Sequence, residues 1–204
     1  MTVYLYQEDL PEGLDFGTSV AVDTETMGLD PRRDRLCLVQ LSAGDGNAHL
    51  VQIARGQTQA PRLCQLLNDP KVEKLFHFAR FDVAALYNAF GVDTRPIFCT
   101  KIASKLVRTS TERHGLKYLL SELVGVDISK QQQSSDWGSA ELSKAQMEYA
   151  ASDVLYLHRL KAALIVRLQR EDRLVLAQSC FDFLPARAKL DLLGWGEPTD
   201  IFHH

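Results

Sequence analysis

The residues that point most clearly to chemistry are two acids at the end of an apolar segment. Asp23 directly follows Val22 in the run SVAVDTET, and Glu25 lies two residues further on. Side chains two residues apart on a strand lie on the same face, so the two carboxylates are expected to be neighbours. Neighbouring carboxylates repel each other unless a cation offsets their charge, and Mg²⁺ and Mn²⁺ prefer oxygen ligands. The pair therefore indicates a metal site, with an ordinary solvated strand end as the alternative.

Two further acids, Asp82 and Asp153, lie at positions where a side chain could bind a ligand. Asp82 follows the apolar run KLFHF at the predicted start of a helix, the kind of junction where α/β sheets bind ligands. Tyr149 and Asp153 lie four residues apart in a helical pattern, so they share a face. Each signal has a structural alternative: Asp82 as an acid that complements the helix dipole, and Asp153 as a boundary acid beside a packed tyrosine.

The three signals are stronger together than apart. Asp23, Glu25, Asp82 and Asp153 carry four negative charges, which two divalent cations would offset. Such a set is typical of two-metal phosphoryl-transfer sites, in which one metal activates a water and the other stabilises the leaving oxygen. A hydroxyl from Tyr149 would then be available to orient the attacking water.

The segments that position these residues alternate between strands and helices. Predicted strands cover residues 19–24, 36–42, 48–53, 73–78 and 96–98. Predicted helices cover residues 59–67, 81–90 and 143–170, the last with Ser143 as its N-cap, and one or two more follow residue 174. Alternating strands and helices predict an α/β fold. The sheet is expected to be mixed, because short turns join the first three strands.

Length and composition fit one globular domain. The chain has 204 residues, 46% of them hydrophobic, and a net charge of −3, which gives no overall argument for nucleic-acid binding. No apolar run approaches the roughly 18–20 residues of a membrane span. The start of the chain does not resemble a secretion signal, so a cytoplasmic location is expected. The four cysteines form no CxxC pair and are interpreted as reduced thiols.

The ordered set of Asp-x-Glu, a central Asp and Tyr-x-x-x-Asp resembles the DEDD 3′→5′ exonucleases, in their tyrosine-bearing branch. The closer resemblance is to ribonuclease D-like proteins, because Asp136-Trp137, Leu142 and Gln146 are similar to the lead-in of that family's third motif. The resemblance covers roughly residues 15–170. It implies an α/β, ribonuclease H-like fold with a mixed five-stranded sheet flanked by helices. The chain would be a short, single-domain form spanning 1–204, with a core at about 15–170 and a helical extension at about 174–204.

The resemblance also implies an activity. The chain would hydrolyse single-stranded or 3′-overhanging RNA from a free 3′-hydroxyl end and release nucleoside 5′-monophosphates. Asp23, Glu25, Asp82 and Asp153 would hold two Mg²⁺ or Mn²⁺ ions, and Tyr149 would position the nucleophilic water. Thr26 would lie near the terminal nucleotide, and Leu29, with Met27 as the alternative, would wedge against the last bases.

Other substrate contacts are expected from the neighbouring sequence. Lys101, Lys105 and Arg108 are spaced i, i+4 and i+7, so a helix would present them on one face that follows phosphates, unless that face is simply solvated. Phe81 is a candidate for base stacking. His77 is expected either to support the site from behind the metal ligands or to be a core histidine.

Three other functions compete with an exoribonuclease. The first alternative is an exonuclease that acts mainly on DNA. The second is a protein that binds nucleic acid without cleaving it. A protein of the second kind is expected to lack at least one metal ligand, whereas all four are present here. A nucleotide-binding oxidoreductase is disfavoured because the chain has no GxGxxG turn. The sequence leaves the oligomeric state open.

Overall fold

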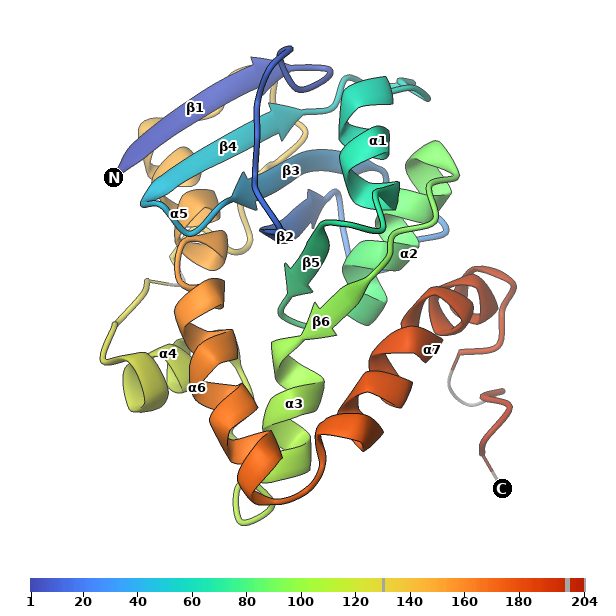
Figure 1. Cartoon of the computed structure of the whole chain (residues 1–204). Helices are drawn as coiled ribbons and strands as arrows, with labels where there is room; N and C mark the ends of the chain where they lie inside the picture. The colour runs from blue at the N-terminus through green and yellow to red at the C-terminus, as the bar shows by residue number, and fades with distance from the viewer. Residues whose placement is uncertain (130, 197–198, 204) are drawn as a thin grey trace.

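The fold is built on one mixed sheet with helices on both faces (Figure 1). The structure is a computed structural model that describes residues 1–129, 131–196 and 199–203, so residues 197, 198 and 204 of the predicted C-terminal extension lie outside the described residues. The strands follow the order β1-β4-β3-β2-β5-β6 across the sheet. They are β1 (Thr2–Gln7), β2 (Ser19–Thr26), β3 (Leu36–Ser42), β4 (Asn47–Gln52), β5 (Glu73–Phe76) and β6 (Ile97–Cys99).

The predicted number of five strands is wrong, because β1 adds a sixth. β1 lies at the edge of the sheet and pairs in parallel with β4, from Thr2 opposite Asn47 to Gln7 opposite Gln52. Most of its side chains are exposed, so its sequence carries little of the apolar signal that identifies a strand. It is stabilised instead by backbone pairing and by stacking of Tyr4 and Tyr6 with His49 of β4.

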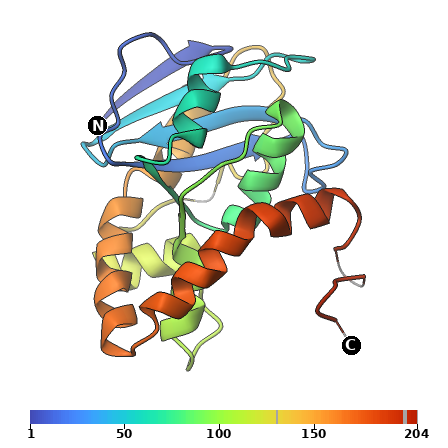
Figure 2. The ribbon, with the colours of Figure 1, turned by 45° about the vertical axis from the view of Figure 1, so that its right-hand side comes forward.

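The helices divide into two groups by position. They are α1 (Pro61–Asn68), α2 (Ala79–Phe90), α3 (Thr100–Val107), α4 (Leu116–Val124), α5 (Lys144–Val154), α6 (Leu157–Arg170) and α7 (Leu174–Leu192). α5 covers one face of the sheet, and α1 and α2 cover the other (Figure 2). α3, α4, α6 and α7 form a helical region beyond the short strands β5 and β6.

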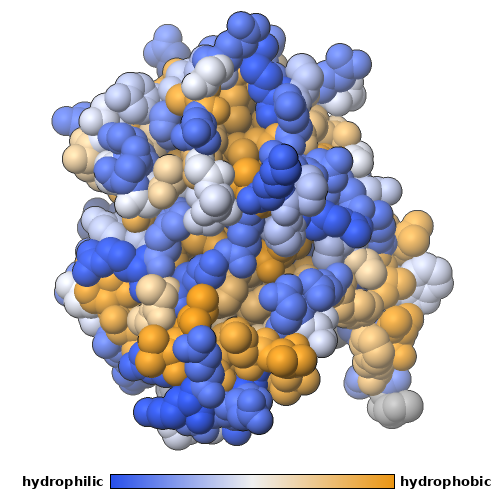
Figure 3. Space-filling model, in the orientation of Figure 1, coloured by the Kyte–Doolittle hydropathy of each residue, from blue (hydrophilic) through white to orange (hydrophobic). Residues whose placement is uncertain are grey.

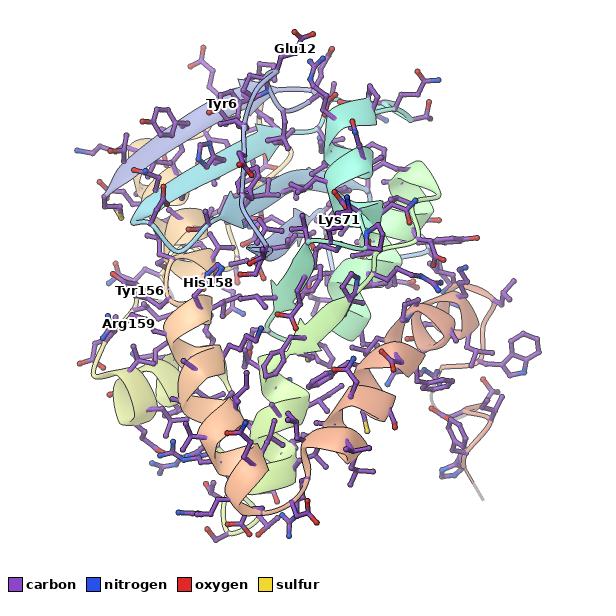
Figure 4. All side chains as sticks on the ribbon, in the orientation of Figure 1. Tyr6, Glu12, Lys71, Tyr156, His158 and Arg159 are labelled. Atoms are coloured by element: carbon purple, nitrogen blue, oxygen red, sulfur yellow. The ribbon has the colours of Figure 1, made fainter. Side chains whose placement is uncertain are left out.

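The predicted helix over residues 143–170 is two helices. Ser143 is the N-cap as predicted, and it forms a capping box with Gln146. The chain leaves helical geometry at Tyr156, whose φ of −112° and ψ of 1° separate α5 from α6. The break lets α5 face the sheet while α6 turns towards α3 and α4. His158 (Figure 4) ties the start of α6 to the sheet, because its Nε2 lies 3.1 Å from Oγ of Ser19.

The central strands place the end of β2 at the middle of the molecule. β3 is buried along its whole length, and it pairs in antiparallel register with β2, with Gln40 opposite Asp23. β2 pairs in parallel with β5 on its other side, so the chain that leaves β5 enters α2 next to the end of β2. This arrangement brings the start of α2 towards Asp23 and Glu25.

Polar side chains cover much of the face shown in Figure 3, and apolar side chains gather over the lower parts of α3, α6 and α7. Val166, Val175 and Leu176 are among the exposed apolar residues of α6 and α7. Among the described residues, no helix is long and apolar enough to cross a membrane.

Candidate active site

Three of the four predicted metal-binding acids meet at the end of β2. Asp23 and Glu25 extend from the same face of β2, and Asp153 reaches them from α5, which covers that face. One carboxylate oxygen from each residue can be chosen so that all three lie within 4.8 Å of one another. The three residues come from segments about 130 positions apart, and their side chains are half-buried.

The fourth acid, Asp82, joins this group from the opposite side of β2. Its side chain is only 3% exposed, and its Oδ1 accepts a hydrogen bond of 2.7 Å from the hydroxyl of Thr24. Thr24 lies between Asp23 and Glu25 and therefore points to the other face of the strand, where α2 packs. Asp23, Glu25, Asp82 and Asp153 are called the acidic cluster below.

The electrostatics of the acidic cluster show strong mutual repulsion. Burial raises the pKa of Asp23 well above its usual value, and the charges of Asp82, Asp153 and Glu25 raise it further. Burial, with the charges of Asp153 and Asp82, raises the pKa of Glu25 to about 9. Burial raises the pKa of Asp82 to about 7, although the hydrogen bond from Thr24 opposes the rise. The four groups cannot all ionise comfortably without a cation beside them.

The donor set fits a divalent cation. Carboxylate oxygens from three directions, held within a few ångströms of one another, are the hard ligands that Mg²⁺ and Mn²⁺ accept. A divalent cation would also offset the burial and the repulsion that raise the pKa values of Asp23, Glu25 and Asp82. These are the reasons for which we expect the acidic cluster to bind metal.

Tyr149 lies on α5 one turn before Asp153, and its side chain reaches the acidic cluster. Burial and the charges of Asp153, Glu25 and Asp23 raise the pKa of its hydroxyl above the usual value, so the group keeps its proton at neutral pH. The ring of Trp137 lies 6.0 Å from the ring of Tyr149, centre to centre, and is 3% exposed. Tyr149 is therefore held as a neutral hydroxyl at a fixed place.

A cleft of about 280 Å³ opens onto the acidic cluster. The predicted residues that line it are all four acids with Tyr149, His77, Phe81 and Lys101. The hydroxyl of Thr100 donates to the carbonyl of Phe76 and accepts a hydrogen bond of 2.9 Å from Nδ1 of His77, which fixes the imidazole ring.

The end of β2 and the loop after it carry the other residues expected near the terminal nucleotide. The hydroxyl of Thr26 donates to the carbonyl of Gly28 and so shapes the turn. Leu29 is 88% exposed, and it lines a second pocket of about 430 Å³ that shares Phe81 with the cleft. Met27 is exposed and lies close to Gly138, in the segment before α5. Of the two expected wedges, Leu29 lines this pocket.

The predicted basic helix face is shorter than expected. Lys101 and Lys105 lie on α3, but α3 ends at Val107, and Arg108 follows it in a non-helical conformation. The guanidinium of Arg108 is 11% exposed and pairs with Glu122 and with the carbonyl of Arg113. Arg108 therefore braces α3 against α4, and the phosphate-binding role expected of this face rests on the two lysines.

Other residues around the site have no distinct sequence signal. Nε2 of Gln40 donates to Oδ2 of Asp23 over 3.4 Å. Gln40 is fully buried on β3, in an apolar run whose pattern indicates only a core strand. Lys117 and Gln133 line the cleft from separate segments. Phe78 lines the same cleft and has a left-handed backbone conformation, which no pattern of residue types predicts.

Comparison with known proteins gives consistent findings. Residues 7–169 match the family model described as 3′-5′ exonuclease. A structure of Brucella melitensis NrnC with bound Mg²⁺ is 57% identical, with a TM-score of 0.95 and 100% of both chains covered. A structure of the same protein bound to pGG is 58% identical, with a TM-score of 0.96 and 100% of this chain and 99% of that one covered.

Ribonuclease D proteins form a second group of relatives. The one from Gluconacetobacter diazotrophicus is 38% identical over 155 residues, which are 76% of this chain and 39% of the relative. The structure of Escherichia coli RNase D is 28% identical and has a TM-score of 0.75. The match covers 85% of this chain and 45% of that one. The chain thus spans about two fifths of the length of the curated relatives it matches.

Proposed function

Because the chain belongs to the 3′-5′ exonuclease family, we propose that it is a metal-dependent exoribonuclease that removes nucleotides from a free 3′-hydroxyl end of RNA. The observation that carries this proposal is the convergence of Asp23, Glu25 and Asp153 on one point, with Asp82 beside them. The products would be nucleoside 5′-monophosphates. A cytoplasmic location remains a prediction from the sequence.

The acidic cluster would hold two Mg²⁺ or Mn²⁺ ions, which would supply a Lewis acid for the scissile phosphate and lower the pKa of a bound water. Asp23, Glu25 and Asp153 would ligate through oxygens on the face of β2 that α5 covers, and Asp82 would do so from the α2 side. Support comes from the mutual repulsion of these acids and from the relative that was solved with Mg²⁺.

Tyr149 would orient the attacking water through its neutral hydroxyl. A protonated phenol both donates and accepts a hydrogen bond, so it would fix the lone pair of the water towards phosphorus without taking its proton. Lys101 would lie on the phosphate side of the cleft, where its charge would offset that of the substrate backbone.

The substrate class would be short single-stranded or 3′-overhanging RNA. The NrnC structure with pGG supports including RNA of two nucleotides, because that relative aligns with this chain over its whole length. A preference for DNA is the second candidate, since only a few contacts to the 2′-hydroxyl separate the two substrates.

A side-by-side digestion tests the proposal. The substrates are pGG, a 5′-labelled RNA heptamer, the DNA heptamer of the same sequence, and the RNA heptamer with a 3′-phosphate. We expect stepwise shortening of RNA from the 3′ end in Mg²⁺ or Mn²⁺, no shortening in EDTA, and resistance of the 3′-phosphate end. Faster cutting of DNA would transfer the proposal to the DNA candidate, and tight RNA binding without nucleotide release would contradict the enzymatic proposal.

A further inference from the structure

Phe78 has a backbone conformation that its side chain disfavours. Its φ of 76° and ψ of 44° lie in the left-handed region, immediately before α2 begins at Ala79. Of the non-glycine residues that the structure describes, only Glu8 and Asp172 also have positive φ. Those two are exposed polar residues at turns, whereas a bulky aromatic residue at such an angle is a genuine outlier. Strain of this kind persists only where the surroundings impose it, and it gathers at functional sites.

The surroundings of Phe78 do impose the conformation. The buried strand β5 fixes the chain before it, and α2 starts directly after it, with the amide of Phe81 donating to the carbonyl of Phe78. The guanidinium of Arg80 forms two hydrogen bonds, of 2.6 and 2.7 Å, with the carboxylate of Asp191 on α7. The first turn of α2 is therefore held at both ends, and the position of Asp82 depends on the same turn.

The strained backbone directs an aromatic ring outwards beside the metal cleft. Phe78 is 45% exposed, although it lies between the buried strand β5 and α2, whose first residue, Ala79, is fully buried. Its side chain lines the cleft of the acidic cluster and also the 430 Å³ pocket of Leu29. The ring is therefore within reach of a molecule that enters either space.

The two sides of the ring have different chemistry. Nζ of Lys101 lies 3.9 Å from the ring centre, and Lys101 lines the cleft but not the pocket of Leu29. Besides Phe78, the apolar side chains that line that pocket are those of Leu29, Pro31, Phe81 and Ala84. A nucleobase has flat apolar faces that stack on aromatic rings, while the phosphate attached to its sugar attracts an ammonium group. The ring thus separates a place suited to a base from a place suited to a phosphate.

We propose that Phe78 is a substrate-binding residue whose ring stacks on a nucleobase of one of the two 3′-terminal nucleotides, in the pocket that it shares with Leu29. The left-handed backbone aims the ring into that position. The inference rests on the proposed function, since it assumes that a nucleic acid occupies the cleft. It adds a residue that determines how tightly the end of the substrate is held.

Substitutions of Phe78 separate stacking from a structural role. Phe78→Leu keeps an apolar side chain but removes the flat ring, and we expect KM to rise on the order of 5- to 100-fold while kcat changes little. Phe78→Tyr keeps the ring and should restore KM to near the wild-type value. Phe78→Asn accepts left-handed geometry readily, so its melting temperature should be at least that of the wild type while its KM rises. A purely structural residue would lose stability and activity together.

Abasic substrates identify the contact directly. Two RNA heptamers lack the base at the 3′-terminal or at the penultimate nucleotide. On one of them, wild type and Phe78→Leu should be cleaved with equal KM, because the base that separates the two proteins is missing. If the difference between the two proteins is the same on both abasic RNAs and on the intact RNA, the stacking proposal is overturned.

Two control variants and a binding measurement complete the test. Tyr4→Leu removes an aromatic ring of similar exposure from β1, and Glu8→Gly relieves the other strained position in the N-terminal half; neither should change KM. Fluorescence anisotropy of a 5′-labelled RNA heptamer in Ca²⁺ measures binding whether or not the wild type cleaves it. Failure of the wild type to release nucleotides would count against the proposed function alone. Equal RNA affinity of wild type and Phe78→Leu would count against stacking alone.

Discussion

Two acids of the acidic cluster, Asp82 and Asp23, are held by different local contacts, so they are not interchangeable. Asp82 accepts a hydrogen bond from Thr24, and Asp23 accepts one from Gln40. Burial raises the pKa of Asp23, and the charges of the three other acids raise it further. A cation would relieve this repulsion, so activity should be sensitive to substitution of Asp23.

Loss of one ligand should abolish turnover. Asp23→Asn and Asp153→Asn are each expected to lower kcat on the order of 10³-fold or more, because the amide keeps the size of the side chain but not its charge. The measurement is release of mononucleotides from the RNA heptamer in Mg²⁺. Asp45→Asn, in the turn between β3 and β4, is the control and should keep wild-type turnover. Near-normal turnover of Asp23→Asn would contradict the assignment.

The tyrosine should act on the chemical step and not on metal binding. Tyr149→Phe removes only the hydroxyl, so kcat is expected to fall on the order of 10²-fold while the metal concentration at half-maximal rate stays unchanged. Tyr156→Phe, at the break between α5 and α6 (Figure 4), is a matched control that should leave both values unaltered. A shift of the metal dependence in Tyr149→Phe would instead place the phenol in the metal site.

Among the elements, β2, α2 and α5 could be predicted from the sequence because their signals are local. The strand run of β2 fixes that Asp23 and Glu25 share a face, and the helical spacing of α5 fixes that Tyr149 and Asp153 do so. β1 could not be recognised, since an exposed edge strand is stabilised by pairing with β4 and not by its own pattern. The left-handed conformation of Phe78 depends on the packing of β5 before it and α2 after it, which local sequence does not encode.

The junction of β5 and β6 depends on a buried lysine. Lys74 on β5 is fully buried, and its ammonium donates to the backbone carbonyls of Asp69, Val72 and Arg95. These carbonyls belong to the segments that precede β5 and β6. The side chain therefore ties together the two segments that enter β5 and β6, at the opposite end of these strands from the starts of α2 and α3.

Removing that ammonium should destabilise the protein without touching the cleft. Lys74→Met is expected to lower the free energy of unfolding by about 3 kcal/mol, because three carbonyl oxygens lose a charged donor. Urea denaturation measures the loss. Lys71→Met, at an exposed position three residues earlier (Figure 4), should stay within about 0.5 kcal/mol of the wild type. Equal stability of the two variants would show that the buried ammonium contributes nothing.

At the scale of the whole molecule, the match to NrnC and RNase D structures confirms the predicted ribonuclease D-like resemblance and the ribonuclease H-like fold class. In the described part of the chain, the matched residues 7–169 are followed by the end of α6, by α7 and by a short tail. α7 packs along α2 and holds Arg80 through Asp191, so the C-terminal part of the chain supports the turn that carries Phe78 and Asp82.

Metal binding should couple to the stability of the whole molecule through pH. The folded protein raises the pKa of Glu25 from 4.5 to about 9 and that of Asp82 from 3.8 to about 7. Between these pKa values, the metal-free fold holds protons that the unfolded chain has released. These bound protons stabilise the fold fully below about pH 4, and this stabilisation is lost as the pH rises through 7 and 9. A cation must displace the same protons, so its affinity rises over that range.

The melting temperature gained on adding Mn²⁺ should accordingly be larger at pH 8 than at pH 6, at the same metal concentration. Differential scanning fluorimetry with and without metal measures the gain, and the titration of groups away from the site cancels in the difference. Asp23→Asn should gain little at either pH. A gain that is constant or smaller at pH 8 would contradict the picture of protonated acids awaiting a cation.

The most direct test of the account is anomalous diffraction from crystals of the protein soaked in Mn²⁺. We expect anomalous peaks at the end of β2, at coordination distance of roughly 2 Å from carboxylate oxygens of Asp23, Glu25 and Asp153. The peaks should disappear in Asp23→Asn crystals. Ordered density for the four acids with no manganese peak between them, or a peak held by other residues, would contradict the claim on which the proposed activity depends.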